Sequence, residues 1–315
     1  MNQLAIPLVN VTQQAALAVY PYIGKEDKNK ADFYATEAMR RTLNNMKGQG
    51  TVVIGEGEMD EAPMLFIGEK VGKEKSPELD IAVDPIDGTK LVASGKEDAI
   101  AVLALAEKGT LLHAPDMYME KIAVGPKAKG VIDLKLSPQE NVRNVAKAMK
   151  KPLSETEVVI QDRPRHQKII EQIRATGAKV SLFQEVDINA AVSTALSSHS
   201  ADMFIGKGGA PEGVIAAVAL RSMGGDFQGK LCVSDQNQYK RCRAMGITDP
   251  EAHLKLEDIV SSDNCLFAAT GITDGRLLNG VREENNFLVT HSFLALEKQL
   301  YVINSQHEMD SSLQL

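Results

Sequence analysis

The segment that most constrains this chain is Asp80-Ile81-Ala82-Val83-Asp84-Pro85-Ile86-Asp87-Gly88-Thr89. An apolar strand, expected over 79–83, leads directly into Asp84 and Asp87. Pro85 stiffens the turn and Gly88 permits a tight one, so the two carboxylates can face one point. Carboxylate oxygens are the ligands that Mg²⁺ and Mn²⁺ prefer. Thr89 is expected to begin a helix, where its hydroxyl and free backbone N–H groups can meet an anion.

The plain alternative is an Asp-rich turn that merely joins a strand to a helix. The full pattern Asp-Pro-x-acid-Gly-hydroxyl is rare, and residue frequencies give it by chance in roughly one chain in a thousand of this length. The run therefore favours a site for a divalent cation and an anion.

Composition excludes several classes of function. Charged residues make up 24% of the chain and hydrophobic ones 43%, which is typical of a globular protein. The formal net charge of −7 argues against nucleic acid or an anionic membrane as the main partner, although a bound metal can still attract a phosphorylated substrate. No apolar run is long enough to span a bilayer, and no signal peptide is evident. The three cysteines lack a C-x-x-C pair, which predicts a reducing, cytoplasmic location without a zinc or disulfide framework.

The chain reads as an α/β protein. Its N-terminal part predicts helices over 12–22 and 31–46 and strands over 51–54, 79–83, 99–106 and 117–124, followed by a helix over 141–149. Strands over 158–160, 180–183 and 203–205 then alternate with helices near 166–175, 188–198 and 212–223, which indicates β-α-β units and a parallel sheet. Three C-terminal strands, near 266–269, 287–289 and 301–303, can join either sheet. Lys150-Lys151-Pro152 is the expected boundary between halves 1–150 and 151–315.

Further acids stand beside glycines in loop-like contexts. Glu56 and Glu58 lie in a Gly-Glu-Gly-Glu turn after a strand, and Glu212 lies in Gly208-Gly209-Ala210-Pro211-Glu212-Gly213. Asp32 stands at the start of the helix expected over 31–46. Each has a plain reading, either as an acid favoured near a helix start or as part of a solvated loop. Their recurrence after strands favours a shared site, because open α/β sheets place sites at strand ends.

Several long motifs resemble those of class II fructose-1,6-bisphosphatases. They are Gly55-Glu56-Gly57-Glu58-x-Asp60-Glu61-Ala62-Pro63-Met64, Ala114-Pro115-Asp116-Met117-Tyr118-Met119, Gly208–Gly213 and Ala269-Thr270-Gly271-Ile272-Thr273. The similarity runs from about Leu8 to Ser292. The Asp-Pro-x-acid-Gly-Thr element is shared more widely, with lithium-sensitive phosphatases similar to inositol monophosphatase. The resemblance implies a layered α-β-α-β-α sandwich and metal-dependent hydrolysis of a sugar-phosphate monoester, a reaction of gluconeogenesis.

The resemblance also implies roles for individual residues. Asp32 and Glu56 would hold one cation, Mn²⁺ or Mg²⁺, and Asp84, Asp87 and Glu212 a second. Lys28, Asp60 and Thr89 would complete the reaction site. The implied substrate contacts are Asp87, Gly88, Thr89, Tyr118, Arg163, Pro164, Arg165, Glu185, Val186, Asp187 and Gly209. On this reading, half 1–150 carries most metal ligands, and half 151–315 carries the substrate-binding loops and Glu212.

Two alternatives stay open for the cationic residues. Arg163 and Arg165 can instead form surface salt bridges, and Lys28 can be a solvated lysine. The histidines are scattered, and only His166, which follows Arg165, is a candidate for phosphate binding.

The chain departs from the family pattern at four places. Asp87 replaces the usual glutamate, and Phe33-Tyr34 replaces small or polar residues. Glu185-Val186-Asp187 replaces Asp-Gly-Asp, so valine stands where glycine would have free access to positive φ. The stretch between Gly229 and Arg241 is shorter than usual.

The function that the resemblance implies is hydrolysis of the 1-phosphate of fructose 1,6-bisphosphate by a cytoplasmic homodimer or homotetramer. The alternatives are the same chemistry on another sugar or inositol phosphate, such as sedoheptulose 1,7-bisphosphate, and a weakly active paralogue that binds sugar phosphate and regulates a partner. Two cations can neutralise phosphate oxygens and lower the pKa of a bound water, so no covalent nucleophile is required.

Overall fold

The computed structural model describes residues 1–57, 64–196 and 201–309, and it divides into two compact units. The first unit is discontinuous in sequence: it combines Met1–Leu105 with the part of the described chain that begins at Leu266. The second unit is the continuous segment Ala106–Cys265. The halves divided at residue 150 that the sequence suggested do not coincide with these units.

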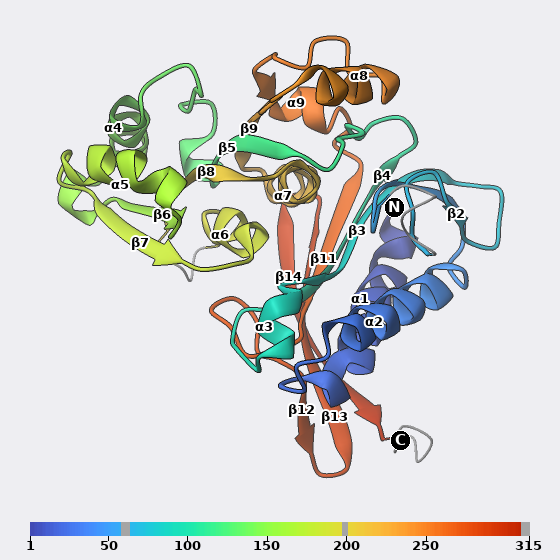
Figure 1. The fold of residues 1–315 in the computed structure, drawn as a ribbon. Helices are drawn as coiled ribbons and strands as arrows, with labels where there is room; N and C mark the ends of the chain where they lie inside the picture. The colour runs from blue at the N-terminus through green and yellow to red at the C-terminus, as the bar shows by residue number, and fades with distance from the viewer. Residues whose placement is uncertain (58–63, 197–200, 310–315) are drawn as a thin grey trace. The chain divides into compact units, whose positions relative to one another are not determined.

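The first unit is built around one mixed sheet, whose strands run in the order β12-β13-β11-β4-β3-β1-β2, with β14 paired to β13 (Figure 1). β1 and β3 are parallel, whereas β13 is antiparallel to β11, β12 and β14. Its strands are β1 (Gln49–Ile54), β2 (Lys70–Val71), β3 (Glu78–Asp87), β4 (Ile100–Glu107), β11 (Cys265–Gly271), β12 (Arg282–Glu284), β13 (Phe287–Leu296) and β14 (Gln299–Glu308). Its helices are α1 (Ala5–Val19), α2 (Lys28–Leu43) and α3 (Thr89–Ala93), with short 3₁₀ turns at Asn2–Leu4 and Tyr20–Tyr22.

A chain of buried polar side chains ties α1 to the C-terminal strands. The Gln13 amide donates to Ser292 Oγ at 3.2 Å and to Ser305 Oγ at 2.9 Å. The hydroxyls of Thr12 and Thr270 are 2.7 Å apart, and those of Thr270 and Ser292 are 2.8 Å apart. Buried polar groups need such partners, so this network fixes α1 against β11, β13 and β14. The C-terminal strands thus join the sheet that holds β1, β3 and β4.

The second unit contains another mixed sheet, with strands in the order β10-β9-β5-β8-β6-β7. β6 is parallel to β7 and β8, as the alternating pattern predicted, but β5 runs antiparallel to both β8 and β9. The strands are β5 (Tyr118–Val124), β6 (Glu157–Gln161), β7 (Lys179–Phe183), β8 (Met203–Gly209), β9 (Asp226–Leu231) and β10 (Leu254–Lys255). The helices are α4 (Pro138–Met149), α5 (Gln167–Arg174), α6 (Asp187–Ser193), α7 (Ala210–Met223), α8 (Gln236–Ala244) and α9 (Leu256–Ile259), with 3₁₀ turns at Pro126–Ala128, Leu153–Glu155 and Pro164–His166.

One hydrophobic cluster of this unit lies between its sheet and helices α4 and α5. Val145 of α4 and Ile173 of α5 pack with Ile122, Ile160 and Met203 of the strands, and all five are fully buried. Burial of each such side chain contributes about 1.5–3 kcal/mol. The cluster holds α5 against the sheet, and α5 follows directly on the turn that carries Arg163 and Arg165.

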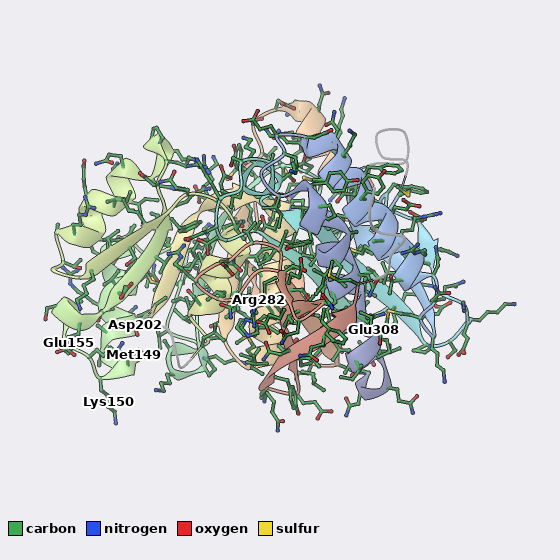
Figure 2. The ribbon with its side chains drawn as sticks, turned by 90° about the horizontal axis from the view of Figure 1, so that it is seen from below. Met149, Lys150, Glu155, Asp202, Arg282 and Glu308 are labelled. Carbon is green, nitrogen blue, oxygen red and sulfur yellow. The ribbon has the colours of Figure 1, made fainter. Side chains whose placement is uncertain are left out.

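The turn after α4, where the sequence suggested a boundary, is anchored inside the second unit. Lys151 Nζ lies 2.7 Å from Asp202 Oδ1, and Asp202 Oδ2 accepts from the backbone N–H of Glu157 at 2.9 Å. Figure 2 shows Met149, Lys150, Glu155 and Asp202 gathered at this end of the unit. The polar residues at 150–152 therefore form a helix-to-strand connection within one unit.

The α/β class predicted from the sequence is confirmed, since each unit combines a mixed sheet with helices. Some element boundaries differ from expectation. The strand expected over 79–83 continues to Asp87, and the first helix begins at Ala5 because Pro7 falls in its first turn, where a missing N–H costs nothing. α4 begins at Pro138 because Ser137 and Glu140 form a capping box. Within the described chain, no helix is both long enough and apolar enough to cross a bilayer.

Candidate active site

Two carboxylates and a helix start lie at the end of β3, in the first unit. Asp87 is the last residue of the strand and is buried, while Asp84 is partly exposed and accepts from the backbone N–H of Ile86 at 3.0 Å. Gly88 has φ 102°, a left-handed conformation that glycine adopts without strain, and α3 begins at the next residue. The strand, a glycine turn and the helix that the sequence predicted here are confirmed, but the strand continues through Pro85 to Asp87, so the turn is confined to Gly88.

Thr89 is the first residue of α3. Its hydroxyl donates to the carbonyl of Ile86 at 3.2 Å, and its side chain is partly exposed. One oxygen at a short helix start, beside two acids, can orient a water molecule or an anion but supplies no nucleophile of its own.

Asp32 and Glu56 form a second acidic pair in the first unit. Asp32 lies in the second turn of α2, and Glu56 follows the end of β1 by two residues. Burial raises the pKa of Asp32. Burial, and then the negative charge of Asp32, raise the pKa of Glu56 to about 7. The two acids are therefore close enough to repel each other when both are ionised.

Asp32 is not explained as an acid that caps a helix. The side chain of Asp27, not that of Asp32, accepts from the backbone N–H of Lys30 at 3.1 Å and caps α2. Lys28, the first residue of α2, is exposed. Asp60 lies outside the described residues.

The chemistry of these acids fits a hard divalent cation. In residues 1–57, 64–196 and 201–309, no group of three His, Cys, Asp or Glu side chains is arranged to hold a metal ion. Carboxylate oxygens are nevertheless the donors that Mg²⁺ and Mn²⁺ take, and a cation would relieve the repulsion between Asp32 and Glu56. The chemical type of these ligands therefore suits a divalent cation. That they coordinate one together stays a prediction.

Glu212 stands in the first turn of α7, in the second unit, beside Pro211. Its Oε2 atom is buried and has no hydrogen-bond partner among the residues that the structure describes. Burial raises the pKa of Glu212 most, followed by the negative charge of Asp187, while the ammonium of Lys121 acts in the opposite direction. A buried carboxylate oxygen without a donor is costly, and a bound cation would satisfy it.

The two glycines before α7 make room for carboxylates. A side chain on Gly208 would collide with the carboxylate of Asp187, and one on Gly209 would collide with that of Glu212. The Gly-Gly pair in the motif Gly208–Gly213 therefore leaves room for two carboxylates to lie against the backbone as they do here.

Arg163 forms an ion pair with another of the predicted substrate residues. Its Nη2 atom lies 2.8 Å from Glu185 Oε1, and both side chains are partly exposed. Arg163 also donates to the carbonyl of Asp162 at 3.0 Å. Its charge is thus already neutralised, as the salt-bridge alternative expected.

Arg165 differs from Arg163 in having only neutral hydrogen-bond acceptors. Its guanidinium donates to the carbonyl of Lys207 at 2.9 Å and to Gln161 Oε1 at 2.6 Å. It also lies 5.2 Å from the ring centre of Tyr118, which is 52% exposed. Among the described residues, no carboxylate forms an ion pair with Arg165. The positive charge is available to a ligand.

Lys207 adds a second cation at the same ring, and the sequence analysis missed it. Its ammonium lies 5.7 Å from the ring centre of Tyr118. Glu120 stands directly opposite Lys207 on β5, yet no ion pair joins the two within the described chain. The sequence did hold a signal, because Lys207 is the one charged residue between the apolar part of β8 and the Gly208–Gly213 motif.

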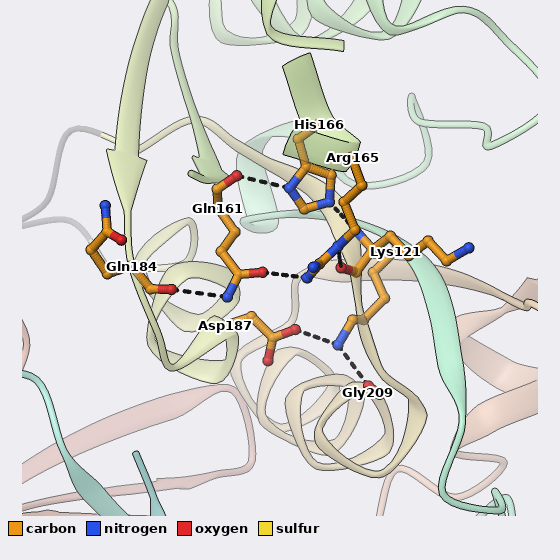
Figure 3. Close-up of polar contacts among 8 residues, drawn as sticks. Lys121, Gln161, Arg165, His166, Gln184, Asp187 and Gly209 are labelled. Carbon is orange, nitrogen blue, oxygen red and sulfur yellow. Dashed lines mark hydrogen bonds and ion pairs between the residues drawn. The ribbon is translucent and has the colours of Figure 1, made fainter. Parts of the chain in front are cut away.

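His166 has a structural role and does not face a ligand. The backbone N–H of Lys207 donates to its Nε2 at 2.9 Å, so the other ring nitrogen, Nδ1, carries the proton and donates to the carbonyl of Gln161 at 2.8 Å (Figure 3). The side chain is 1% exposed, and burial lowers its pKa. The idea that His166 helps to bind phosphate is wrong, because both ring nitrogens are used by backbone.

Gln161 links these residues at the end of β6. Its amide donates to the carbonyl of Gln184 at 3.0 Å and its Oε1 accepts from Arg165 (Figure 3). This residue holds the Arg165 guanidinium in place with a neutral group, which leaves the charge of Arg165 intact. It was also missed in the sequence, where a glutamine at a strand end carries no distinctive signal.

Val186 adopts a backbone conformation that valine rarely takes. It has φ 67° and ψ 71°, in the left-handed region, at the residue before α6. The replacement of glycine by valine was expected to remove access to positive φ, and the structure shows that it does not. The side chain is only 5% exposed, so burial of its methyl groups offsets part of the strain.

Comparison with known proteins gives one consistent family. Residues 2–307 match the family model described as bacterial fructose-1,6-bisphosphatase, glpX-encoded. The chain is 46% identical over 324 residues to fructose-1,6-bisphosphatase 1 class 2 of Escherichia coli, covering 98% of this chain and 96% of that protein. It is 43% identical to a D-fructose 1,6-bisphosphatase class 2/sedoheptulose 1,7-bisphosphatase of Trichodesmium erythraeum, covering 93% and 92%.

A solved structure of an extragenic suppressor from Pyrococcus furiosus aligns with 61% of this chain and 68% of its own, at 12% identity and a TM-score of 0.32. That agreement is too low to bear on the fold. The family match, by contrast, extends over nearly the whole chain. The motifs around Glu56, Asp84, Tyr118 and Glu212 all lie inside it. The chain belongs to the bacterial class II fructose-1,6-bisphosphatase family.

Proposed function

We propose that this protein hydrolyses the 1-phosphate of fructose 1,6-bisphosphate, giving fructose 6-phosphate and phosphate. Membership of a family of phosphoric monoester hydrolases supports the reaction. The observation that carries the proposal is the end of β3, where Asp84 and Asp87 precede a left-handed Gly88 and the start of α3. Two acids beside a tight turn and a helix start suit a phosphate bound through a cation.

We propose that the cations are Mn²⁺ or Mg²⁺. Asp32 and Glu56 would hold one, and Asp84, Asp87 and Glu212 the other. Bound there, the metals would neutralise phosphate charge and lower the pKa of the attacking water, which a reaction as slow as phosphate-monoester hydrolysis requires.

The protein's own groups would then orient the reactants. Thr89 offers a hydroxyl for the attacking water or the transferred phosphoryl group, Gly88 leaves room for the sugar phosphate, and Lys28 and Asp60 would complete the site. Cys242 and Cys265 are not suited to nucleophilic attack, because burial raises the pKa of both thiols and keeps them protonated at neutral pH.

A second phosphate would be held by the cations at Tyr118. Arg165 and Lys207 lie near one aromatic ring without a carboxylate partner among the described residues, and two such cations suit a phosphate. Pro164 would fix the direction of the Arg165 turn, and Gly209 and the Glu185–Asp187 segment would contact the sugar. Arg163 would act through Glu185, because the two already form an ion pair.

Sedoheptulose 1,7-bisphosphate is the second candidate substrate. The Trichodesmium erythraeum relative carries both fructose 1,6-bisphosphatase and sedoheptulose 1,7-bisphosphatase in its name. Both substrates carry two phosphates, so the Arg165–Lys207 cations suit either. The enzyme would act in the cytoplasm, where its free cysteines Cys232, Cys242 and Cys265 stay reduced, and as a homodimer or homotetramer.

A phosphate-release assay tests the proposal. The full chain is assayed with fructose 1,6-bisphosphate, sedoheptulose 1,7-bisphosphate, fructose 1-phosphate and an inositol monophosphate, with Mn²⁺, with Mg²⁺ and with excess EDTA. We expect rapid release from a sugar bisphosphate with metal and none in EDTA, with recovery when metal is restored. Full activity in EDTA would exclude the metal assignment. Release from none of the substrates would favour a regulatory paralogue.

A further inference from the structure

Lys121 is a fully buried lysine in the middle of β5. Its side chain is 1% exposed, and its ammonium lies 2.5 Å from Asp187 Oδ2 and 2.7 Å from the carbonyl oxygen of Gly209 (Figure 3). The neighbouring residues Met119, Ile122 and Ala123 are buried and apolar. A charged residue in such a position needs a reason.

Stability does not supply that reason. Removing an ammonium and a carboxylate from water costs several kcal/mol per ion, and apolar residues of similar size in place of a buried pair are often as stable or more so. Asp187 is only 14% exposed, so both members of this pair are largely desolvated. The fold alone would be served as well by two apolar residues in place of Lys121 and Asp187.

Two elements, β8 and α7, leave out side chains beside the lysine. A Cβ atom on Gly208 would lie 3.1 Å from Lys121 Nζ, and one on Gly213 of α7 would lie 3.1 Å from Lys121 Cδ. The site is therefore built around the full length of the side chain.

The two partners of Lys121 belong to different segments. Asp187 is the first residue of α6 and ends the Glu185–Asp187 segment. Gly209 is the last residue of β8 and stands three residues before Glu212. The ammonium of Lys121 thus links the Gly209 backbone, which leads to Glu212, with the Asp187 carboxylate of the Glu185–Asp187 segment.

We propose that Lys121 is a positioning residue for substrate binding, which acts by holding Asp187 against the Gly209 backbone. This inference rests on the proposed function. The ammonium fixes the Asp187 carboxylate at the start of α6. Because Val186 precedes Asp187 directly, the same contact helps to hold the left-handed backbone of Val186 in place. Without the ammonium, Asp187 is a buried carboxylate lacking its cation, and the segment leaves its binding conformation to reach water.

The test compares Lys121→Met, Asp187→Asn and the double variant in the full chain. Lys121→Met should raise the KM for fructose 1,6-bisphosphate about tenfold or more, and Asp187→Asn should raise it to a similar extent. In the double variant, Lys121→Met should add no more than about twofold to the KM of Asp187→Asn, because the residue through which Lys121 acts is already altered. The double variant should recover thermal stability that Lys121→Met loses, without recovering KM.

Binding of fructose 1,6-bisphosphate to the metal-free protein in EDTA, measured by calorimetry, tests the same variants without turnover. The Kd should rise in Lys121→Met and in Asp187→Asn, and no further in the double variant than in Asp187→Asn. Lys151→Met is the matched control, since Lys151 pairs with Asp202 at 2.7 Å in the same unit. It should lower stability and leave KM unchanged.

Unchanged KM and Kd in Lys121→Met would overturn the proposal. So would a double variant whose KM equals the product of the two single effects. If Lys121→Met does not fold, Lys121→Gln, which keeps a polar end group but no positive charge, takes its place in the same comparisons. Failure of the proposed function is distinguishable, because it would show as no phosphate release by the wild-type chain.

Discussion

Arg163 forms a 2.8 Å ion pair with Glu185, whereas within the described part of the chain Arg165, two residues further on, donates only to a backbone carbonyl and to the amide oxygen of Gln161. The two arginines flank one proline and look equivalent in the sequence. Their environments differ, because Arg163 is paired with a neighbouring acid, whereas the guanidinium of Arg165 is held by neutral groups.

Arg165→Ala should therefore raise the KM for a sugar bisphosphate far more than it lowers kcat. The binding free energy of the phosphate that is not cleaved is nearly the same in the ground state and the transition state, so its loss raises KM and leaves kcat nearly unchanged. A charge-assisted contact contributes about 1.5–3 kcal/mol, so KM should rise roughly ten- to a hundredfold. Steady-state kinetics on fructose 1,6-bisphosphate and on a monophosphate provide the measurement.

The monophosphate should be turned over as before, and Arg163→Ala should raise KM less than Arg165→Ala does. A bisphosphate KM that does not change in Arg165→Ala would remove this residue from the site. Much of the argument for a substrate with two phosphates would go with it.

Asp84→Ala should abolish turnover and leave the fold intact. The loss of a proposed metal ligand removes both the cation and its stabilisation of charge in the transition state. Cys242→Ala, at a buried thiol that contacts Met117, should keep near wild-type kcat. Circular dichroism and kcat with Mn²⁺ are compared for both variants. Retention of more than about a tenth of wild-type kcat by Asp84→Ala, a loss under 1.4 kcal/mol, would show that Asp84 is not a central ligand.

The buried imidazole of His166 should make the protein less stable in acid. The pKa of His166 is lowered in the folded state, chiefly by burial. The unfolded chain therefore takes up a proton near the ordinary histidine pKa of about 6.5, at a pH where His166 in the folded chain stays neutral. The stabilisation is complete above that pH and is lost as the pH falls toward the lowered folded value. His166→Gln should lose less stability than wild type between pH 7.5 and 5.5, measured as the shift of the urea midpoint. Equal shifts for the two proteins would contradict a neutral, buried His166.

Val186→Gly should change stability by less than about 1 kcal/mol. Glycine removes a buried side chain, but it also removes the cost of a β-branched residue at φ 67°, roughly 1–2 kcal/mol, so the two effects nearly cancel. Val192→Gly in α6 is the matched control, because Val192 is also buried but lies inside the helix, where its backbone is not left-handed. It should cost about 3 kcal/mol or more. Equal losses in thermal or urea unfolding would mean that Val186 carries no strain.

The local parts of the site could be predicted from the sequence. Strand, turn and helix over Asp80–Thr89 follow from an apolar run, a glycine and a hydroxyl, all within ten residues. The pair Gly208-Gly209 before Pro211 likewise marks a close approach and a helix start. Such features depend on backbone preferences of neighbours, which one stretch of sequence contains.

Features set by distant residues could not be predicted. Lys121 reads as an ordinary strand lysine, and its side chain is accommodated by Gly208, Gly213 and Asp187, far along the chain. The return of the C-terminal strands to the first sheet depends on contacts such as that of Gln13 with Ser292. The extent of β3 was likewise underestimated, since apolar patterning stops at Val83 while the extended backbone continues to Asp87.

The continuous second unit enters and leaves the first between β4 and β11, which are neighbours in one sheet. On the ribosome, residues Ala106–Cys265 can therefore complete their own core while β4 still lacks the strand that will cover its edge. At about 5–20 residues per second, synthesis of that segment takes on the order of 10–30 s. During this interval the exposed edge of β4, apolar from Ile100 to Ala106, is a surface on which other nascent chains can add a strand. Chaperone demand during synthesis should therefore concentrate on the first unit, although its N-terminal part emerges first.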